Sequence, residues 1–309
     1  MTNLVFLTGD YCSGSTLVST LFRKSGQYYC LYEPLHERLP EFLIWRPNPD
    51  PYDHHFFAKD NYREMARFDR IADLHSSKWG SSSLYLSPDA EADDLYRYMS
   101  YVIGSSFGRF PRVMFKENRI AFRLGWIRSR FPSAKIVHIL RDPESQWKSN
   151  VRRVQEFLRR EDVGQNLVTY NGFNVATFCE DLKSTFPELA AENFSSGYDR
   201  FHKLWELSYR ENQKHADISV NYRDLTRDFE PTWTRVWTCI GAPPIDVRTL
   251  KQYVVPPEKQ KDLVRDQPQI EKKVQALISR FGSYYARARL RARDPLHKRG
   301  SSQTPETLR

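Results

Sequence analysis

The chain has 309 residues and a mass of 36.5 kDa, and its composition is 40% hydrophobic, 14% aromatic and 28% charged. Such a chain can bury a sizeable core, and its aromatic content excludes disorder for most of its length. No run of about 18 apolar residues occurs and the start, MTNLVFLTGD, lacks a signal-peptide pattern, so we expect a soluble, cytoplasmic protein. The four cysteines lack CxxC spacing, which favours reduced thiols over disulfides or structural zinc.

The net charge of +9 is concentrated at the end of the chain. Residues 280–309 carry +6, which leaves +3 for the first 279 residues. This segment could bind RNA or an acidic membrane, but the simpler interpretation is a solvated helix end that continues into a disordered tail. No nucleic-acid-binding motif accompanies it, so we expect no nucleic-acid partner. The predicted organisation is one domain over residues 1–282 and a basic, flexible tail over 283–309.

Short apolar runs alternate with helical patterns along the chain. Residues 4–8 (LVFLT) are too short for a helix and precede a glycine, so they predict a buried strand. In chain order the pattern predicts a strand at 4–8, a helix at 16–23, a strand at 28–32, a helix at 90–102, a strand at 112–115, a helix at 120–131, a strand at 135–140, helices at 143–160 and 198–215, a strand at 218–222 and a helix at 230–239. Two insertions, about 38–110 and 158–197, are expected to be helical or irregular.

This alternation predicts an α/β fold with a P-loop-like core, in which helices flank a central parallel sheet of about five strands. Ligands of such sheets bind at the carboxyl ends of the strands. Four turns rich in polar and charged residues should therefore meet at that edge, namely residues 9–16, 33–37, 116–119 and 141–149.

The first of these turns has the spacing of a phosphate-binding loop. Gly9, Gly14 and Thr16 fit the pattern G-x-x-x-x-G-x-[ST], in which backbone N–H groups at a helix N-terminus bind phosphate oxygens. Position 15 is Ser, whereas kinases and triphosphatases place a Lys there. A kinase in which Asp142 binds Mg²⁺ is therefore the weaker enzyme alternative, and a purely structural Gly/Ser turn is the other alternative.

Taken with its flanks, the SGST turn resembles the 5′-phosphosulfate loop of sulfotransferases that use 3′-phosphoadenosine 5′-phosphosulfate. The segment KIVHILRDPESQWKS resembles the 3′-phosphate motif of that family, and VNYRDL resembles its YEDL segment, whose Tyr lies near the adenine. An Arg at a strand end and a Ser two helical turns later can converge on one phosphate. The resemblance implies nucleotide-binding roles for the following residues: Cys12, Ser13, Gly14, Ser15, Thr16, Arg141, Ser149 and Tyr222.

The segment LYEPLHE most resembles the LYEP segment of carbohydrate sulfotransferases and their bacterial relatives. The resemblance implies transfer of the sulfuryl group from 3′-phosphoadenosine 5′-phosphosulfate to a hydroxyl, or alternatively an amine, of a glycan or small-molecule acceptor. The nucleotide product is adenosine 3′,5′-bisphosphate, and no metal is required. The two insertions should then form the acceptor side, and the oligomeric state is not predicted. The alternative outside enzymes is an RNA-binding or membrane-binding protein that acts through its basic tail.

Position 12 departs from this family pattern, because the family usually has Arg or Lys there and this chain has Cys12. Sulfuryl transfer builds negative charge on the leaving phosphate oxygen, so another cation should face it. Lys116, at the end of the third predicted strand, is the candidate, with Arg119 behind it. Arg23 lies too far along its helix, and the structural alternative for Lys116 is an ion pair with Glu117 or another neighbour.

A hydroxyl acceptor also requires a base for its proton. Glu33 directly follows the second predicted strand and matches the Glu of the LYEP segment, so it is the preferred base. His36 and Glu37 are alternatives, since cytosolic relatives use a His, and the structural alternative for Glu33 is a carboxylate that holds the phosphate loop through backbone N–H groups. The first insertion adds residues that could line an acceptor pocket or form a small core: Trp45, Tyr52, His54, His55, Phe56 and Phe57.

Overall fold

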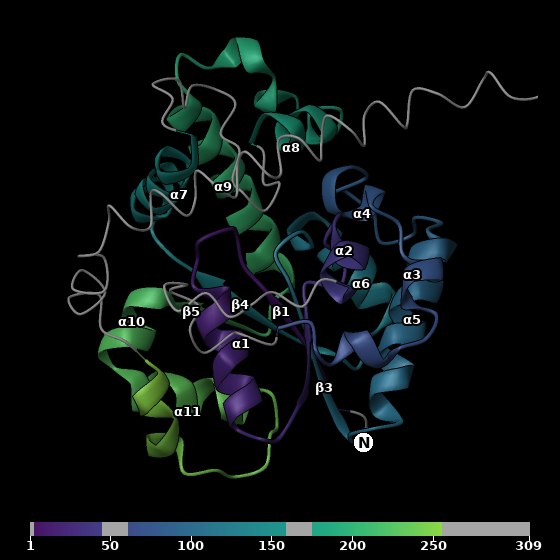
Figure 1. Ribbon diagram of the computed structural model, residues 1–309. Helices are drawn as coiled ribbons and strands as arrows, with labels where there is room; N and C mark the ends of the chain where they lie inside the picture. Colours follow the sequence, from purple (N-terminus) through teal and green to yellow (C-terminus); the bar gives the residue numbers. More distant parts are fainter. Residues whose placement is uncertain (1–2, 45–60, 159–174, 255–309) are drawn as a thin grey trace, which may run out of the picture. The chain divides into compact units, whose positions relative to one another are not determined.

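Figure 1 shows the computed structural model, which describes residues 3–44, 61–158 and 175–254. The described residues form a parallel sheet of five strands in the order β2-β3-β1-β4-β5. The strands are β1 (Asn3–Thr8), β2 (Tyr29–Tyr32), β3 (Arg112–Glu117), β4 (Lys135–Leu140) and β5 (Ile218–Asn221). The predicted α/β class, with a central parallel sheet of about five strands, is confirmed. The predicted domain boundary at residue 282 lies outside the described residues.

The alternation of side chains in β1 divides the core into two layers. Leu4 and Phe6 pack on one face of the sheet, whereas Val5 and Leu7 pack on the other, and all four are buried. A strand covered on both faces has no solvent side, so its sequence is a continuous apolar run with no polar alternation. Figure 1 shows α1 (Ser15–Lys24) and α11 (Phe229–Cys239) on one side of the sheet and α5 (Asp93–Phe107) and α6 (Leu124–Arg130) on the other.

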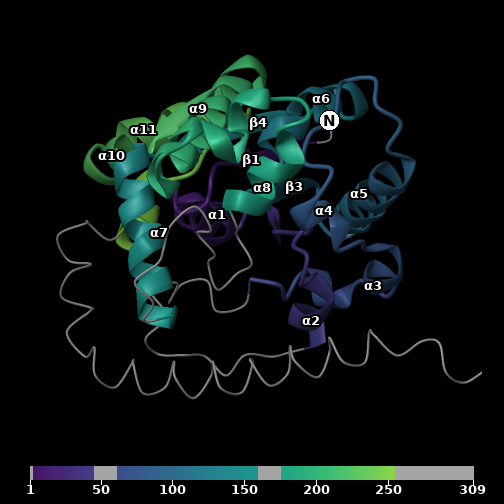
Figure 2. The same cartoon turned by 90° about the horizontal axis from the view of Figure 1, so that it is seen from above.

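The remaining helices lie in the insertions or follow the strands. They are α2 (Leu39–Ile44), α3 (Ile71–Leu74), α4 (Lys78–Ser81), α7 (Pro143–Leu158), α8 (Val175–Leu182), α9 (Gly197–His215) and α10 (Tyr222–Arg227). Short 3-10 helices occupy Met65–Arg67, Ala121–Arg123, Pro187–Leu189, Ala191–Asn193 and Val247–Tyr253. Figure 2 shows α8 beside α9, and these two helices share a third apolar cluster with the turn after β1.

Several of the predicted boundaries differ from those in the structure. Asn221 ends β5 because its side chain accepts a hydrogen bond from the N–H of Arg223 and begins α10, so the predicted strand is one residue too long. Helix α5 begins three residues later than predicted, because Ala90 lies in a turn. The helix then continues to Phe107. The predicted helix over 120–131 begins as a 3-10 turn, and only Leu124–Arg130 is α-helical.

No helix within residues 3–44, 61–158 and 175–254 combines the length and the apolar character needed to cross a membrane. The same ranges contain no cluster of three or more metal-ligating side chains.

Candidate active site

The turn after β1 has the backbone geometry of an anion-binding loop. Cys12 (φ 64°) and Gly14 (φ 101°) adopt left-handed conformations, and α1 begins at the next residue. The first N–H groups of a helix lack intrahelical acceptors. Ser13 is buried, and its hydroxyl has no hydrogen-bond partner among the described residues. The loop therefore presents donors that suit the oxygens of a phosphate.

Arg141 and Tyr222 lie against this loop, although they are far from it in the sequence. The Tyr222 ring packs on the bare Cα of Gly14, where an added Cβ would lie 2.3 Å from the ring. The Arg141 guanidinium lies over the same ring, 4.9 Å from its centroid, and its Nη1 is 3.5 Å from the carbonyl oxygen of Cys12. The three predicted nucleotide contacts therefore meet at one place.

Helix α7 brings its first two turns to the same loop. Asn150 is buried and its side-chain oxygen accepts a hydrogen bond of 3.3 Å from the Cys12 thiol, and Ser149 precedes it on the helix. Asp142 accepts a hydrogen bond of 2.8 Å from the N–H of Ser145 and thereby caps α7. A kinase would use the Asp142 carboxylate to bind Mg²⁺, whereas in this structure the same carboxylate caps a helix.

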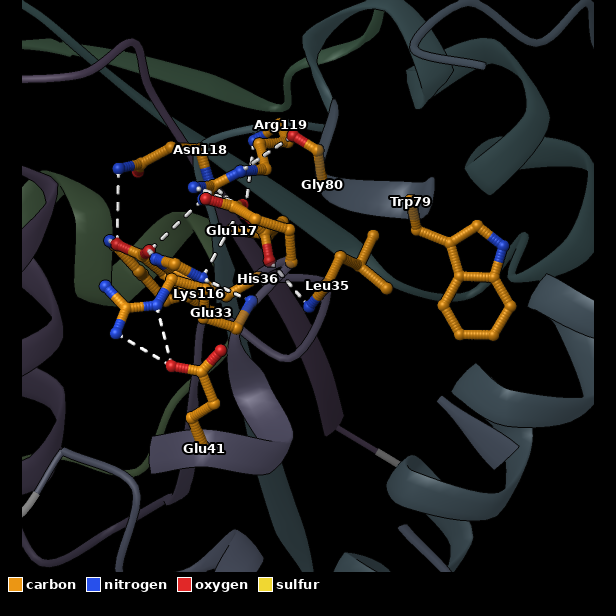
Figure 3. Close-up of polar contacts among 12 residues, drawn as sticks. Glu33, Leu35, His36, Glu41, Trp79, Gly80, Lys116, Glu117, Asn118 and Arg119 are labelled. Atoms are coloured by element: carbon orange, nitrogen blue, oxygen red, sulfur yellow. Dashed lines mark hydrogen bonds and ion pairs between the residues drawn. The ribbon is translucent and has the colours of Figure 1, made fainter. Parts of the chain in front are cut away.

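Beside the loop, β2 and β3 end in a buried ion pair. The Lys116 ammonium donates to the carboxylate of Glu33 (Figure 3). It also lies 4.2 Å from the centroid of the Tyr32 ring. Both charged side chains are almost fully buried. Glu33 has a left-handed backbone (φ 44°), a conformation that is unfavourable for a side chain of this size. Its own N–H still donates to the Lys116 carbonyl oxygen at 2.8 Å, which holds the strand ends together.

Arg119 adds a second cation to Glu33 and uses its donors fully. Its Nη1 lies 3.2 Å from Glu33 and 3.4 Å from Glu117, its Nη2 lies 3.0 Å from Glu37, and its Nε donates to the carbonyl oxygen of Gly80. Burial alone would raise the pKa of Glu33, but the charges of Lys116 and Arg119 outweigh it and hold that pKa well below its usual range. Glu33 is therefore ionised at neutral pH.

His36 lies in the same cluster as a neutral side chain. Its Nδ1 accepts a hydrogen bond of 3.1 Å from the N–H of Arg38, so the ring proton resides on Nε2. Nε2 lies 4.0 Å from Glu33 Oε2 and has no hydrogen-bond partner among the described residues. Burial and the nearby Arg119 charge lower the pKa of His36 well below its ordinary value. In this tautomer Nε2 donates a proton and cannot accept one.

Two polar contacts connect this cluster to the phosphate loop. The Ser15 hydroxyl donates to Asn118 Oδ1 at 2.9 Å, and the Asn118 amide lies 3.4 Å from Glu33 Oε1. The Thr16 and Tyr32 hydroxyls share a hydrogen bond of 2.9 Å. The turns at 9–16, 33–37, 116–119 and 141–149 thus lie at one edge of the sheet, as the sequence predicted.

Backbone support in this region comes from Glu117 and not from Glu33. The Glu117 carboxylate accepts hydrogen bonds from the N–H groups of Leu35, Asn118 and Arg119. Glu33 accepts only from side chains in the contacts described above, whereas Glu117 braces the backbone of the turns that follow β2 and β3. The sequence did not single out this role, because Glu117 directly follows Lys116 in β3 and both side chains are buried.

A pocket opens next to the cluster, and the sequence did not point to most of its residues. Its polar lining comes from Asp10, Asn118, Arg119 and Ser208, and α8 and α9 supply much of its apolar lining. Gln146 connects the pocket to the nucleotide side, since it donates to the Tyr11 carbonyl oxygen and accepts from the Trp205 indole. Asp10 and Asn118 follow strand ends, which was the one signal that could have identified them.

Two further predictions concern residues away from this centre. Arg23 pairs with Glu64 at 2.9 Å near the end of α1, which agrees with its dismissal as the catalytic cation. Asn61 also accepts from it. The aromatic and histidine residues proposed for an acceptor pocket lie outside the described residues: Trp45, Tyr52, His54, His55, Phe56 and Phe57.

A family model described as "Sulfotransferase family" matches residues 5–246, and no curated protein matches the chain. The sulfotransferase domain of the curacin biosynthetic pathway is similar in structure, with a TM-score of 0.44 and 16% identity over 82% of this chain and 78% of that chain. Sulfotransferase STF9 from Mycobacterium avium has a TM-score of 0.41 and 12% identity over 91% of this chain and 76% of that chain.

The sulfotransferase domain of the olefin synthase from Synechococcus PCC 7002 has a TM-score of 0.40 and 14% identity over 87% of this chain and 93% of that chain. The family match covers more than half of the chain and includes most of β1, the other four strands, the phosphate loop and the Glu33–Lys116 pair. The chain therefore belongs to the sulfotransferase family.

Proposed function

We propose that this protein transfers the sulfuryl group of 3′-phosphoadenosine 5′-phosphosulfate to a hydroxyl group of a glycan or small-molecule acceptor. The observation that carries the proposal is the connection of the phosphate loop to a buried cation and carboxylate, through Ser15, Asn118 and Glu33. Through these hydrogen bonds the phosphate loop, the Lys116 cation and the Glu33 carboxylate belong to one connected group. The four free thiols suit a reducing compartment such as the cytoplasm.

The chain's own groups fit such a nucleotide. The unpartnered Ser13 hydroxyl and the first N–H groups of α1 would bind the 5′-phosphosulfate. Arg141 and Ser149 would bind the 3′-phosphate, and the Tyr222 ring would lie near the adenine. The nucleotide supplies the sulfuryl group to be transferred and leaves as adenosine 3′,5′-bisphosphate.

Lys116 is the cation that we assign to the transfer. Its ammonium lies at the carboxyl end of β3, beside a phosphate loop that lacks the cation usual at position 12. A preorganised cation stabilises the negative charge that develops on the leaving oxygen. Arg119 is the poorer candidate, because its guanidinium is engaged by three carboxylates and a carbonyl oxygen.

Glu33 is the base that we assign to the acceptor hydroxyl. His36 is the weaker candidate for the base, because its Nε2 carries the proton in this tautomer and acts as a donor. While Lys116 and Arg119 both face Glu33, its carboxylate is a weak base, because the two cations stabilise its charge. Movement of the Lys116 ammonium toward the leaving oxygen would raise the basicity of Glu33 at the moment when the hydroxyl loses its proton.

A nucleotide titration tests the proposal directly. The full chain should bind adenosine 3′,5′-bisphosphate at least about tenfold more tightly than ATP, since its loop lacks the triphosphate-binding lysine. It should also release adenosine 3′,5′-bisphosphate from the sulfated nucleotide only when an acceptor is present. Preference for ATP, with phosphoryl transfer, would contradict the proposal and favour the kinase alternative.

A further inference from the structure

The pocket beside the phosphate loop combines an apolar body with one carboxylate. Leu84, Phe122, Phe178, Phe201 and Leu204 line it with aliphatic and aromatic side chains. These residues come from the turn after α4, the 3-10 helix before α6, and helices α8 and α9, and all of them are buried. A surface of this kind accepts an aromatic ring or an alkyl chain.

Asp10 supplies the carboxylate at the end of this pocket. The Ser208 hydroxyl on α9 donates a hydrogen bond to Asp10 Oδ1, and no described residue donates to Oδ2. Burial raises the pKa of Asp10 to about 6, because the hydrogen bond from Ser208 only partly offsets the loss of water. At pH 7.5 the carboxylate is therefore mostly ionised, and among the described residues no side chain of opposite charge pairs with it.

The other charged side chain in the pocket lining does not neutralise Asp10. Arg119 directs its guanidinium to Glu33, Glu37 and Glu117, as described above. The remaining ionisable side chain in the lining is the Tyr11 phenol, which carries no positive charge in either protonation state. An ionised carboxylate in apolar surroundings is costly unless a cation pairs with it, so the described lining favours a positively charged ligand group.

The pocket also adjoins the centre of sulfuryl transfer. Asn118 lines the pocket and at the same time joins Ser15 of the phosphate loop to Glu33. Tyr11 lines the pocket one residue after Asp10, within the loop itself. A molecule in this pocket would therefore hold its hydroxyl group near the base and its other polar group near Asp10.

We propose that the acceptor has an apolar, ring-bearing body and a protonated amine, and that Asp10 binds the amine while another group of the acceptor, a hydroxyl, receives the sulfuryl group. This inference rests on the proposed function and narrows its acceptor class. Asp10 acts as a specificity-determining residue and takes no part in the transfer step.

Matched pairs of phenols test the inference with the full chain and 3′-phosphoadenosine 5′-phosphosulfate. Tyramine and 4-ethylphenol form one pair, and 4-hydroxybenzylamine and 4-methylphenol form the other, so that each pair differs chiefly in the amine. We expect kcat/KM to favour the amine by roughly 10- to 100-fold, the scale of a charge-assisted hydrogen bond. Asp10→Asn should abolish this preference, whereas Asp94→Asn, at an exposed surface ion pair, should retain it.

A pH series keeps the test decisive if Asp10→Asn fails to fold. Between pH 7.5 and pH 5 Asp10 becomes mostly protonated while the amines stay charged, so the preference should fall roughly tenfold in the wild-type protein. The ratio within a pair cancels pH effects that both acceptors share. A preference that is absent, unchanged down to pH 5 or retained in Asp10→Asn would overturn the inference.

The outcome also separates this inference from the proposed function. If the sulfuryl group is transferred to the neutral phenols or to a neutral sugar but to neither amine, the proposed amine-bearing acceptor is wrong. The proposed function, sulfuryl transfer, would still hold. Failure to bind adenosine 3′,5′-bisphosphate would instead contradict the proposed function itself.

Discussion

Lys116 and Glu33 form a buried ion pair between the carboxyl ends of two adjacent parallel strands. The charge of the ammonium depresses the pKa of the Glu33 carboxylate. Both partners are almost fully shielded from water, so removal of one leaves the other as an uncompensated buried charge. Variants at either position must therefore be compared by both their activity and their folding.

The variant Glu33→Gln tests the base. We expect kcat to fall by roughly 10² to 10⁴ while the affinity for adenosine 3′,5′-bisphosphate stays near wild type, because the amide cannot accept the proton. Steady-state kinetics and nucleotide titration measure the two effects. Lower nucleotide affinity with retained kcat would show a bracing role. Activity in Glu33→Gln together with inactivity in His36→Asn would transfer the role to His36.

Lys116→Met tests the cation. Its kcat should fall far more than its affinity for adenosine 3′,5′-bisphosphate, because the ammonium acts on charge that appears during the transfer. The matched control Cys12→Ser should change both quantities less than about tenfold, since neither a thiol nor a hydroxyl supplies positive charge. If Cys12→Arg fails to restore any activity to Lys116→Met, the two positions do not share one role.

Arg141→Ala tests the nucleotide site. Loss of a charge-assisted contact should weaken adenosine 3′,5′-bisphosphate by about 2 to 4 kcal/mol and scarcely affect adenosine 5′-monophosphate. Calorimetry with both nucleotides measures the difference. Lys148→Ala removes a cation from the same helix region, where it pairs with Glu144 on the surface, and should leave both affinities unchanged. Equal losses for both nucleotides in Arg141→Ala would identify Arg141 as structural.

Gly9→Ala tests the packing of the loop on β4. An added Cβ would lie 2.6 Å from the Ile139 carbonyl oxygen and 2.7 Å from the Ser13 hydroxyl, so the free energy of unfolding should fall by about 1 to 3 kcal/mol. Gly104→Ala, inside α5, meets no atom within 4 Å and should raise that free energy by up to about 1 kcal/mol. Urea unfolding compares the two, and equal effects would contradict the tight approach at Gly9.

The buried His138 side chain should make the free energy of unfolding depend on pH. Burial lowers its pKa to about 3, whereas a histidine in the unfolded chain titrates near 6.5. The unfolded state binds a proton first as the pH falls, so the stability contributed by neutral His138 is present above pH 6.5 and is lost below it. Between pH 7 and pH 4.5 the loss should be about 2.5 kcal/mol. His138→Gln should remove that part of the dependence, and an unchanged slope would contradict the assignment.

The sequence by itself determined the order of strands and helices and the turns that carry the chemistry. Continuous apolar runs such as residues 4–8 can form only strands buried on both faces, and parallel strands bring their carboxyl ends to one edge. The phosphate loop, Glu33, Lys116 and Arg141 could therefore be selected from local patterns.

Only the tertiary structure decided which of these groups face one another. The pairing of Lys116 with Glu33 and the bracing by Glu117 depend on strand register, because a shift of one residue exchanges the faces of all side chains. Asp10 and Ser208 meet across 198 positions of sequence. No local pattern encodes such a contact, since it arises where α9 packs over the turn after β1. The pocket formed there is the feature from which we infer the chemical class of the acceptor.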